Sequence, residues 1–205
     1  MNRHTDEELV SLCLAGRKDA FDEIVQRYQK PVFKIAYTLA GNYEDASDWS
    51  QDSFLQIYRS LKSFDAEKGK FFSWLYRVAH NVCINKKAQR DGARPKKATA
   101  DEFEQEQESK ARIVSIESIA EPTVPESDVK SNPQAALEAA GLQEEIRTAL
   151  ARLGEKYSVP IMLQYIEGLS YKEISERLGL PQSTIETRLF RGKKMLQKEL
   201  QHLKK

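Results

Sequence analysis

Cysteine is scarce in this sequence: Cys13 and Cys83 are the only two among 205 residues, and no Cys-x-x-Cys spacing links them. Disulfide scaffolds and structural zinc sites need more cysteines at shorter spacings, so we expect two ordinary thiols in a reducing cytosol. Long apolar runs are also missing: no stretch approaches the roughly 18–20 residues of a membrane span, and the opening MNRHTDEELV has no apolar signal-peptide core. We therefore expect a cytoplasmic protein without membrane insertion.

Patterns that carry catalytic chemistry are also missing from the sequence. There is no Gly-rich phosphate loop and no cluster with metal-ligand spacing, and His4, His80 and His202 are scattered along the chain. These absences predict that the chain is not an enzyme. We expect no catalytic residues, no metal, no cofactor and no small-molecule substrate.

Net charge is small, with 32 basic against 31 acidic side chains, but the charges are segregated. Residues 1–95 carry 15 basic and 13 acidic side chains, residues 96–135 carry 5 and 9, and residues 136–205 carry 12 and 9. The middle of the chain is therefore acidic. Residues 188–205 hold seven Lys or Arg and one acid, Glu199. This basic end favours a polyanionic partner.

Helical periodicity is abundant, whereas strand-type alternation is absent. Apolar residues recur at three- and four-residue steps from Thr5 to Gly16 and over residues 21–39, 45–61 and 71–89, which predicts a bundle of four amphipathic helices. We expect Thr5 and Glu8 to form a capping box, Gly16 to end the first helix, and Pro31 to mark a kink or a helix restart. The third helix is expected to bury Phe54, Ile57, Tyr58 and Leu61.

The periodicity stops between about Arg94 and Gln134, in a stretch rich in Pro, Glu, Gln, Ser and Lys. Such a composition is typical of a linker. Helical pattern resumes at Ala135 and continues along the chain. The sequence thus predicts an all-α protein with two small helical domains, residues 1–95 and 135–205, joined by a long, acidic and flexible linker, residues 96–134.

Two helix starts lie thirteen residues apart near the C-terminus, because a Ser precedes a Glu by three residues at Ser170/Glu173 and again at Ser183/Glu186. Between them stands Gly179-Leu180-Pro181. Two helices joined by a short Gly-containing turn form a helix-turn-helix, with residues 170–178 as the supporting helix and residues 183–200 as the recognition helix. Four apolar residues are expected to pack this pair together: Ile174, Leu178, Ile185 and Leu189.

The opposite face of the second helix carries small hydroxyl residues first and cations further on. This order suits a helix in the major groove, where short side chains approach base edges and cations approach phosphates. Glu186 either closes the capping box or faces a cytosine amino group, and the spacing favours the cap. The expected DNA-reading residues are Ser183, Thr184, Glu186, Thr187, Arg188, Arg191 and Lys194.

Three segments of the chain stand out together: LSYKEISERLGLPQSTIETRLFRGKKMLQKEL, YEDASDWSQDSFLQIYRSLKSFD and KGKFFSWLYRVAHNVCINKKAQR. They resemble extracytoplasmic-function (group IV) sigma factors of the sigma-70 family, the smallest bacterial RNA polymerase specificity subunits. The first is similar to the family's promoter-reading C-terminal domain, the second to its polymerase-binding segment, and the third to its melting and minus-ten-reading segment. The resemblance implies a region-2 bundle in residues 1–95 and a region-4 helix-turn-helix domain, which reads the minus-thirty-five element, in residues 135–205.

Acidic residues gather at the start of the third expected helix, where residues 41–52 contain four acids and no base. Asp45, Asp48 and Asp52 recur at steps of three and four, so they share one helix face, which we call the acidic ridge. A ridge of this kind attracts a basic surface; the resemblance implies the clamp helices of the polymerase β′ subunit. Trp49 suits an apolar anchor and a core residue equally well. The expected polymerase-binding residues are Asp45, Asp48, Trp49, Gln51, Asp52 and Gln56.

The next segment reverses the charge, since residues 68–94 hold seven Lys or Arg and one acid, interleaved with aromatic residues. Cations that follow a backbone, together with aromatic faces that accept unstacked bases, suit single-stranded DNA. The resemblance implies that Asn81 and the loop Phe64–Lys70 form the pocket for a base flipped out of the minus-ten element. The expected minus-ten residues are Phe64, Lys70, Trp74, Arg77, Asn81, Lys87 and Arg90.

The resemblance also implies the partners: core RNA polymerase through its β′ clamp helices and its β flap, promoter DNA, and an anti-sigma factor. Bound to polymerase, the protein is expected to associate with the nucleoid. Two other functions remain open on the residues alone. A dimeric helix-turn-helix regulator explains residues 136–205 only, and an RNA- or single-strand-binding accessory factor is supported by residues 68–94 only.

Overall fold

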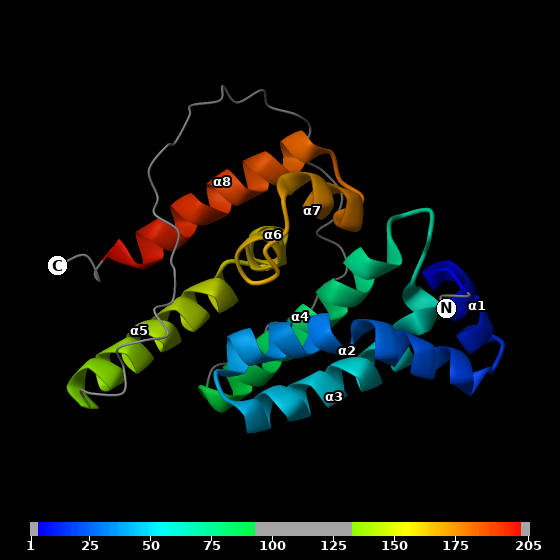
Figure 1. Cartoon of the computed structure of the whole chain (residues 1–205), viewed down its shortest axis with the longest axis horizontal. Coiled ribbons are helices and arrows are strands. Elements are labelled where there is room, and N and C mark those ends of the chain that lie inside the picture. Colours follow the sequence, from blue (N-terminus) through cyan, green and yellow to red (C-terminus); the bar gives the residue numbers. More distant parts are fainter. Residues whose placement is uncertain (1–3, 93–132, 202–205) are drawn as a thin grey trace. The chain divides into compact units, whose positions relative to one another are not determined.

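The computed structural model of this chain describes residues 4–92 and 133–201. All regular structure in these two ranges is helical, as expected for an all-α protein (Figure 1). The expected linker, residues 96–134, lies outside the described residues except for its last two positions. The elements are α1 (Asp6–Leu14), α2 (Lys18–Ala40), α3 (Tyr43–Ser60), the 3-10 turn η1 (Leu61–Ser63), α4 (Phe71–Arg90), α5 (Pro133–Arg152), α6 (Glu155–Tyr165), α7 (Tyr171–Leu178) and α8 (Gln182–Glu199).

The described residues up to 92 and those from 144 onward belong to one compact unit, whereas residues 133–143 belong to a second. In the first unit α2, α3 and α4 lie side by side, and α1 packs on α2 (Figure 1). Helices α6, α7 and α8 also pack on one another, and α4 contacts both α6 and α7. None of the described helices combines the length and the apolar character that crossing a membrane requires.

Helix α1 begins as the sequence predicts. The Thr5 hydroxyl accepts a hydrogen bond from the Glu8 amide at 3.2 Å, and the Glu8 carboxylate accepts one from the Thr5 amide at 2.7 Å. This reciprocal capping box satisfies two amides that the first helical turn leaves without partners. The expected stop is confirmed as well, because α1 ends at Leu14 and Gly16 takes a φ of 92° that favours glycine.

Of the two expectations for Pro31, a kink or a helix restart, the restart is wrong. Helix α2 runs without a break over residues 18–40 and contains Pro31 in its interior. A proline inside a helix costs about 3 kcal/mol because it removes a hydrogen bond and crowds the preceding turn. The buried stripe of α2, which includes Ile24, Val32 and Ile35 at 0% exposure, packs against the neighbouring helices and offsets that cost.

One core residue expected on α3 is also wrong. Tyr58 is 48% exposed, although the other three residues of that set, Phe54, Ile57 and Leu61, are buried or packed against the core. The Tyr58 ring instead meets Phe21 edge-on, with ring centroids 4.9 Å apart. An aromatic ring at the border of a helix stripe keeps its polar hydroxyl in water while its edge contacts apolar surface.

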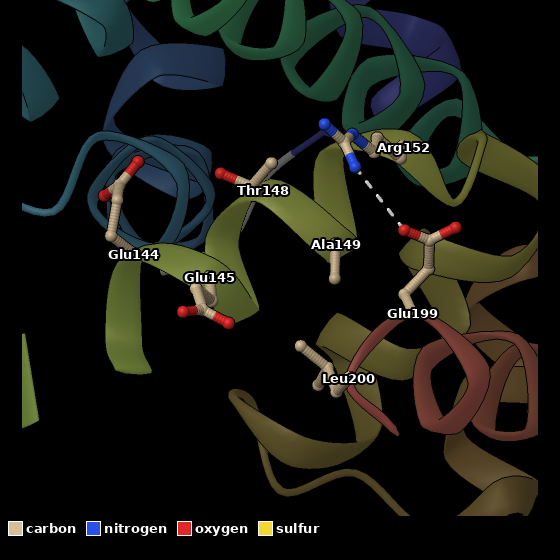
Figure 2. A pocket seen from close by; sticks show the side chains of 7 residues that line it. All are labelled: Glu144, Glu145, Thr148, Ala149, Arg152, Glu199 and Leu200. Carbon is tan, nitrogen blue, oxygen red and sulfur yellow. Dashed lines mark ion pairs between the residues drawn. The ribbon is translucent and has the colours of Figure 1, made fainter. Parts of the chain in front are cut away.

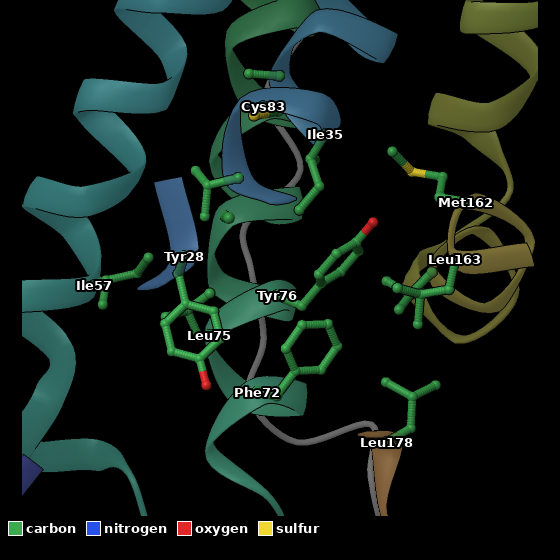
Figure 3. Close-up of a cluster of buried hydrophobic side chains, with 14 of the residues drawn as sticks. Tyr28, Ile35, Ile57, Phe72, Leu75, Tyr76, Cys83, Met162, Leu163 and Leu178 are labelled. Atoms are coloured by element: carbon green, nitrogen blue, oxygen red, sulfur yellow. The ribbon is translucent and has the colours of Figure 1, made fainter. Parts of the chain in front are cut away.

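A continuous hydrophobic core connects α4 with the helices after residue 144. Tyr76 of α4 is 1% exposed, and Met162 and Leu163 of α6 are fully buried. In Figure 3 the side chains of Phe72 and Tyr76 point toward Met162, Leu163 and Leu178. Burying a side chain of this size stabilises a fold by roughly 1.5–3 kcal/mol, so this shared core holds the unit together.

The helix-turn-helix is present in α7 and α8. Ser170 accepts from the Glu173 amide and Glu173 accepts from the Ser170 amide, so the first expected capping box is confirmed. Helix α7 ends at Gly179, whose φ of 67° lets the chain reverse, and the Ser175 hydroxyl donates to the Leu180 carbonyl at 2.6 Å. The four residues expected to pack the two helices together are all buried: Ile174, Leu178, Ile185 and Leu189.

Candidate polymerase and nucleic-acid interface

The acidic ridge lies along α3, but its three aspartates differ in their surroundings. Asp48 is exposed. Asp45 accepts from Asn42 at 2.7 Å and from Arg90 at 3.1 Å, and these hydrogen bonds hold the pKa of the Asp45 carboxyl below its ordinary value. Asp52 forms an ion pair with Lys86 of α4. Asp45 therefore keeps its negative charge to lower pH than an ordinary aspartate does, and Asp48 is the most accessible carboxylate of the ridge.

Beside the acidic ridge, the two glutamines expected to bind polymerase are exposed, whereas Trp49 is buried. Gln51 and Gln56 are both exposed. Trp49 is only 5% exposed and packs in the core, and the Arg90 guanidinium lies 5.3 Å from the centre of its ring. Of the two roles open to Trp49, the structure places it in the core rather than on the surface, because its helix face is the one that turns toward α4.

Helix α4 carries most of the residues expected at the minus-ten element. Trp74 is partly buried, and its ring centroid lies 5.7 Å from that of Phe64 and 5.7 Å from that of Phe71. Phe71 and Phe72 are buried. The structure therefore brings Phe64, from the loop before α4, next to Trp74, so that the two expected site residues form one aromatic cluster.

Two expected minus-ten residues on α4 are held by one carboxylate. Asn81 donates from Nδ2 to Glu155 Oε2 at 2.9 Å, and Arg77 Nε lies 3.4 Å from Glu155 Oε1. Glu155 is the first residue of α6, where a carboxylate is favoured by the helix dipole. Arg77 and Asn81 stand four residues apart on the same helix face, so the two oxygens of Glu155 reach both of them at once.

Lys87 is a correction to the expected minus-ten surface. Its side chain is 2% exposed and forms ion pairs with Asp91, at 3.1 Å, and with Glu144 of α5. A buried cation must be paired, and Lys87 is paired with these two acids rather than presented to solvent. Partial burial alone raises the pKa of Glu144, but its hydrogen bonds with Lys87 and Arg147 hold that pKa below the ordinary value. Arg90, also expected on this surface, bonds to Asp45 and lies 3.6 Å from Glu144.

The recognition helix α8 presents a polar stripe opposite its buried face. Ile185, Leu189 and Gly192 are buried against the rest of the unit. On the other side, at steps of four, four and three, four of the expected DNA-reading residues are exposed: Ser183, Thr187, Arg191 and Lys194. Thr184, Glu186 and Arg188 flank this stripe and are partly buried.

The second expected capping box is wrong. Helix α8 begins at Gln182 after Pro181, and no side chain caps its first turn. Pro181 takes the N-cap position, and its carbonyl accepts hydrogen bonds from the Thr184 and Ile185 amides, so α8 begins one residue before the expected Ser183. Ser183 then lies inside the helix, where its carbonyl accepts from Thr187 at 2.8 Å. Glu186 accepts from Gln182 Nε2 at 3.0 Å instead of reaching back to a cap, so the capping interpretation of Glu186 fails.

Two parts of the chain match a known protein family. Residues 24–92 match the family description Sigma-70 region 2, and residues 143–196 match Sigma-70, region 4. Over 188 residues the chain is 34% identical to the ECF RNA polymerase sigma factor SigW of Bacillus subtilis, which covers 92% of each protein. The chain belongs to the extracytoplasmic-function family of RNA polymerase sigma factors.

This sigma factor directs RNA polymerase to promoters, and it binds core RNA polymerase and promoter DNA. It is also 29% identical over 199 residues to the sigma-E factor of Haemophilus influenzae, covering 97% of each chain, and 30% identical over 202 residues to that of Escherichia coli, covering 97% of this chain and 96% of the relative. These relatives are sigma factors rather than enzymes. A solved structure of CnrH in complex with the cytosolic domain of CnrY aligns with a TM-score of 0.47 at 21% identity, over 95% of this chain and 96% of that one.

Sequence reasoning missed three residues of this sigma factor that contact the α4 surface: Glu144, Glu155 and Ser158. Ser158 of α6 is fully buried, and its hydroxyl donates to the Gly154 carbonyl at 2.9 Å while lying 2.8 Å from His80 Nε2. A hydroxyl has one hydrogen, so His80 is the donor in this pair and carries its proton on Nε2. His80 and Ser158 lie 78 positions apart in the chain, so local periodicity gives no indication of their contact.

A pH-dependent loss of stability is expected from His80. Burial lowers the pKa of His80 from 6.5 to about 4, more than the opposing hydrogen bond with Asn81 raises it. Between pH 6.5 and pH 4 the unfolded chain therefore binds a proton that the folded chain does not bind. The free energy of unfolding falls as the pH drops through this range, by roughly 3 kcal/mol. Denaturant unfolding across this range should show a smaller loss in His80→Gln than in the wild type.

His4→Gln is the matched control, because His4 is exposed. The lowered pKa of carboxyls such as Asp45 affects all three proteins equally and cancels in the comparison. Equal slopes of stability against pH in the wild type and His80→Gln would contradict the assignment of a neutral, buried His80.

An open cleft of about 260 Å³ lies between α5 and the end of α8 (Figure 2). Arg152 and Glu199 face each other across it at 3.5 Å. In residues 4–92 and 133–201, no group of three or more His, Cys, Asp or Glu side chains is arranged to hold a metal ion. The residues that line the cleft are Glu144, Glu145, Thr148, Ala149, Arg152, Glu199 and Leu200.

Proposed function

We propose that α8 reads the minus-thirty-five element of the promoter from the major groove. The observation that supports this most is the exposed stripe Ser183, Thr187, Arg191 and Lys194, which lies opposite the buried face of the helix. Hydroxyl groups at the start of the helix reach base edges, and the following cations reach bases and phosphates. Since Glu186 does not cap the helix, we assign it to the edge of this surface, beside Thr184 and Arg188.

For binding to polymerase, we propose the acidic ridge of α3. Asp48, Gln51 and Gln56 are exposed there, and the charge of Asp45 is stabilised by its hydrogen bonds. A surface of this kind complements the basic β′ clamp helices that the family resemblance implies. The β flap is the second contact, made by the C-terminal domain. Trp49 supports the ridge from the core and does not itself touch polymerase.

For the minus-ten element, we propose that α4 and the loop before it hold the opened strand. Phe64 and Trp74 form an aromatic cluster suited to stacking, and Lys70, Arg77 and Asn81 provide cations and an amide. Lys87 is buried, so its role is to hold α4 in place by pairing with acids rather than to touch DNA. Arg90 joins the ridge to α4 through Asp45.

The domain boundaries that fit these roles are residues 1–95, 96–134 and 135–205. We further propose that the chain contributes no chemistry of its own, needs no cofactor, and acts in the cytoplasm, where polymerase and the nucleoid lie. An anti-sigma factor that captures it is expected from the family resemblance.

The test is reconstituted transcription from genomic DNA fragments, with purified core RNA polymerase and the full chain. Start sites that appear only when the protein is added, preceded by shared elements near minus thirty-five and minus ten, are the expected result. Footprints from the protein alone, without new start sites, would instead support a stand-alone helix-turn-helix regulator.

A further inference from the structure

A carboxylate of α1 binds a buried tyrosine of α2. Tyr28 is 7% exposed, and its hydroxyl donates to Asp6 Oδ2 at 2.5 Å. Arg27 forms an ion pair with the other oxygen of the same carboxylate, so both oxygens of Asp6 are engaged within the chain. Burial and the Asp6 carboxylate raise the pKa of the Tyr28 hydroxyl, which therefore keeps its proton and acts as the donor. Because a buried hydroxyl needs a partner, this bond fixes the position of the Tyr28 ring.

The Tyr28 ring contacts the aromatic residues at the start of α4. Its centroid lies 5.9 Å from that of Phe71, which it meets edge-on, and 6.1 Å from that of Phe72. Phe71 also meets Phe64 edge-on at 5.2 Å and stacks on Trp74 at 5.7 Å. Phe71 therefore contacts both Tyr28 and the two aromatic residues proposed to stack on the minus-ten strand.

Helix α1 supports the same aromatic cluster at a second point. It packs against the 3-10 turn η1, which immediately precedes Phe64. The Phe64 amide donates to the Leu61 carbonyl of this turn at 3.1 Å. Contacts between aromatic rings depend on their offset and angle, so a shift of Phe71 or of η1 changes how Phe64 and Trp74 are presented to a base.

We propose that Asp6 and Tyr28 are positioning residues for minus-ten recognition: their hydrogen bond holds Phe71, and through it Phe64 and Trp74, in the arrangement that accepts an unstacked base. Neither Asp6 nor Tyr28 touches DNA. This inference rests on the proposed function of Phe64 and Trp74. Side chains that are already ordered bind and discriminate a base better, because the cost of ordering them is not subtracted from binding.

The first test is the minus-ten preference of Tyr28→Phe in reconstituted transcription with core RNA polymerase. The readout is the ratio of transcript yields from a template with the mapped minus-ten element and from one in which that element is scrambled. Tyr28→Phe keeps the ring and removes only the hydroxyl. The ratio should fall about tenfold, the lower end of the range for a hydrogen bond to a charged group. A variant that is only less stable lowers both yields together and leaves the ratio unchanged.

Tyr37→Phe is the matched control, because it deletes a hydroxyl from the same helix α2 at a residue that is 48% exposed. It should keep the wild-type ratio. Two changes at Asp6 separate its roles as acceptor and as charge. Asp6→Ala removes the acceptor and should lower the ratio as Tyr28→Phe does, whereas Asp6→Asn keeps an acceptor oxygen for Tyr28 and should lower it less.

Tryptophan fluorescence gives a second readout that needs neither DNA nor polymerase. The chain has two tryptophans, and Trp49 is only 5% exposed, so quenching by acrylamide reports mainly on the partly buried Trp74. Quenching should increase in Tyr28→Phe and stay at the wild-type level in Tyr37→Phe.

An unchanged minus-ten preference in Tyr28→Phe would overturn the proposal, and so would an equal loss of preference in Tyr37→Phe. Trp74→Ala in the holoenzyme tests the underlying assignment separately. If Trp74→Ala keeps the wild-type preference, the proposed role of the aromatic cluster at the minus-ten element is wrong. A loss of preference in Trp74→Ala, together with a wild-type preference in Tyr28→Phe, defeats only the positioning role of Asp6 and Tyr28.

Discussion

Asp48→Lys should abolish most of the transcription that this sigma factor directs, by on the order of one hundredfold. Asp48 is exposed, so the substitution leaves the helix bundle intact. It places a cation where a basic polymerase surface is expected, and juxtaposed like charges cost several kcal/mol, with each 1.4 kcal/mol equal to a factor of ten. The measurement is the yield of specific transcripts with core polymerase, together with co-purification of the variant with core polymerase.

Asp22→Lys on α2 is the matched control, because Asp22 is an exposed aspartate outside the acidic ridge. It should direct transcription at the wild-type level. Both variants should unfold at the wild-type temperature, which shows that the loss comes from binding. A fully active Asp48→Lys protein would remove α3 from the polymerase interface and leave the acidic ridge without a function.

Arg191→Glu should reduce transcription from promoters that depend on the minus-thirty-five element by about tenfold to one hundredfold. Arg191 lies in the exposed stripe of α8, and losing a base- or phosphate-contacting arginine costs roughly 1–3 kcal/mol before the repulsion of the new carboxylate is added. The measurement is promoter-specific transcription at a stated salt concentration, since phosphate contacts weaken as salt rises.

The promoter itself supplies the control for this variant. On a template whose minus-thirty-five element has been scrambled, the wild type and Arg191→Glu should give the same low yield, because the recognition helix has lost its target. A defect of equal size on both templates would show that Arg191 acts elsewhere, for example in binding polymerase.

Local sequence patterns predicted most of the helices because their signals lie within a few residues. The capping boxes at Thr5 and Ser170 depend on side chains three positions apart, and the acidic ridge depends on aspartates three and four apart. The same reasoning failed at Ser183, where Pro181 starts the helix first. It also failed for a helix restart at Pro31, where packing of α2 outweighs the local cost of proline.

The sequence by itself determined the all-α class, the helix-turn-helix, the polar stripe of α8 and the charge reversal between α3 and α4, because each is a short-range pattern. Only the tertiary structure decided which charged residues are available. Lys87 and Asn81 are paired with acids 57 and 74 positions away, and Trp49 lies in the core rather than on the ridge. Periodicity indicates which face of a helix a residue occupies. The residue that it contacts on that face is brought there by the packing of segments far apart in the chain. That contact decides whether a charge is buried, paired or presented to DNA.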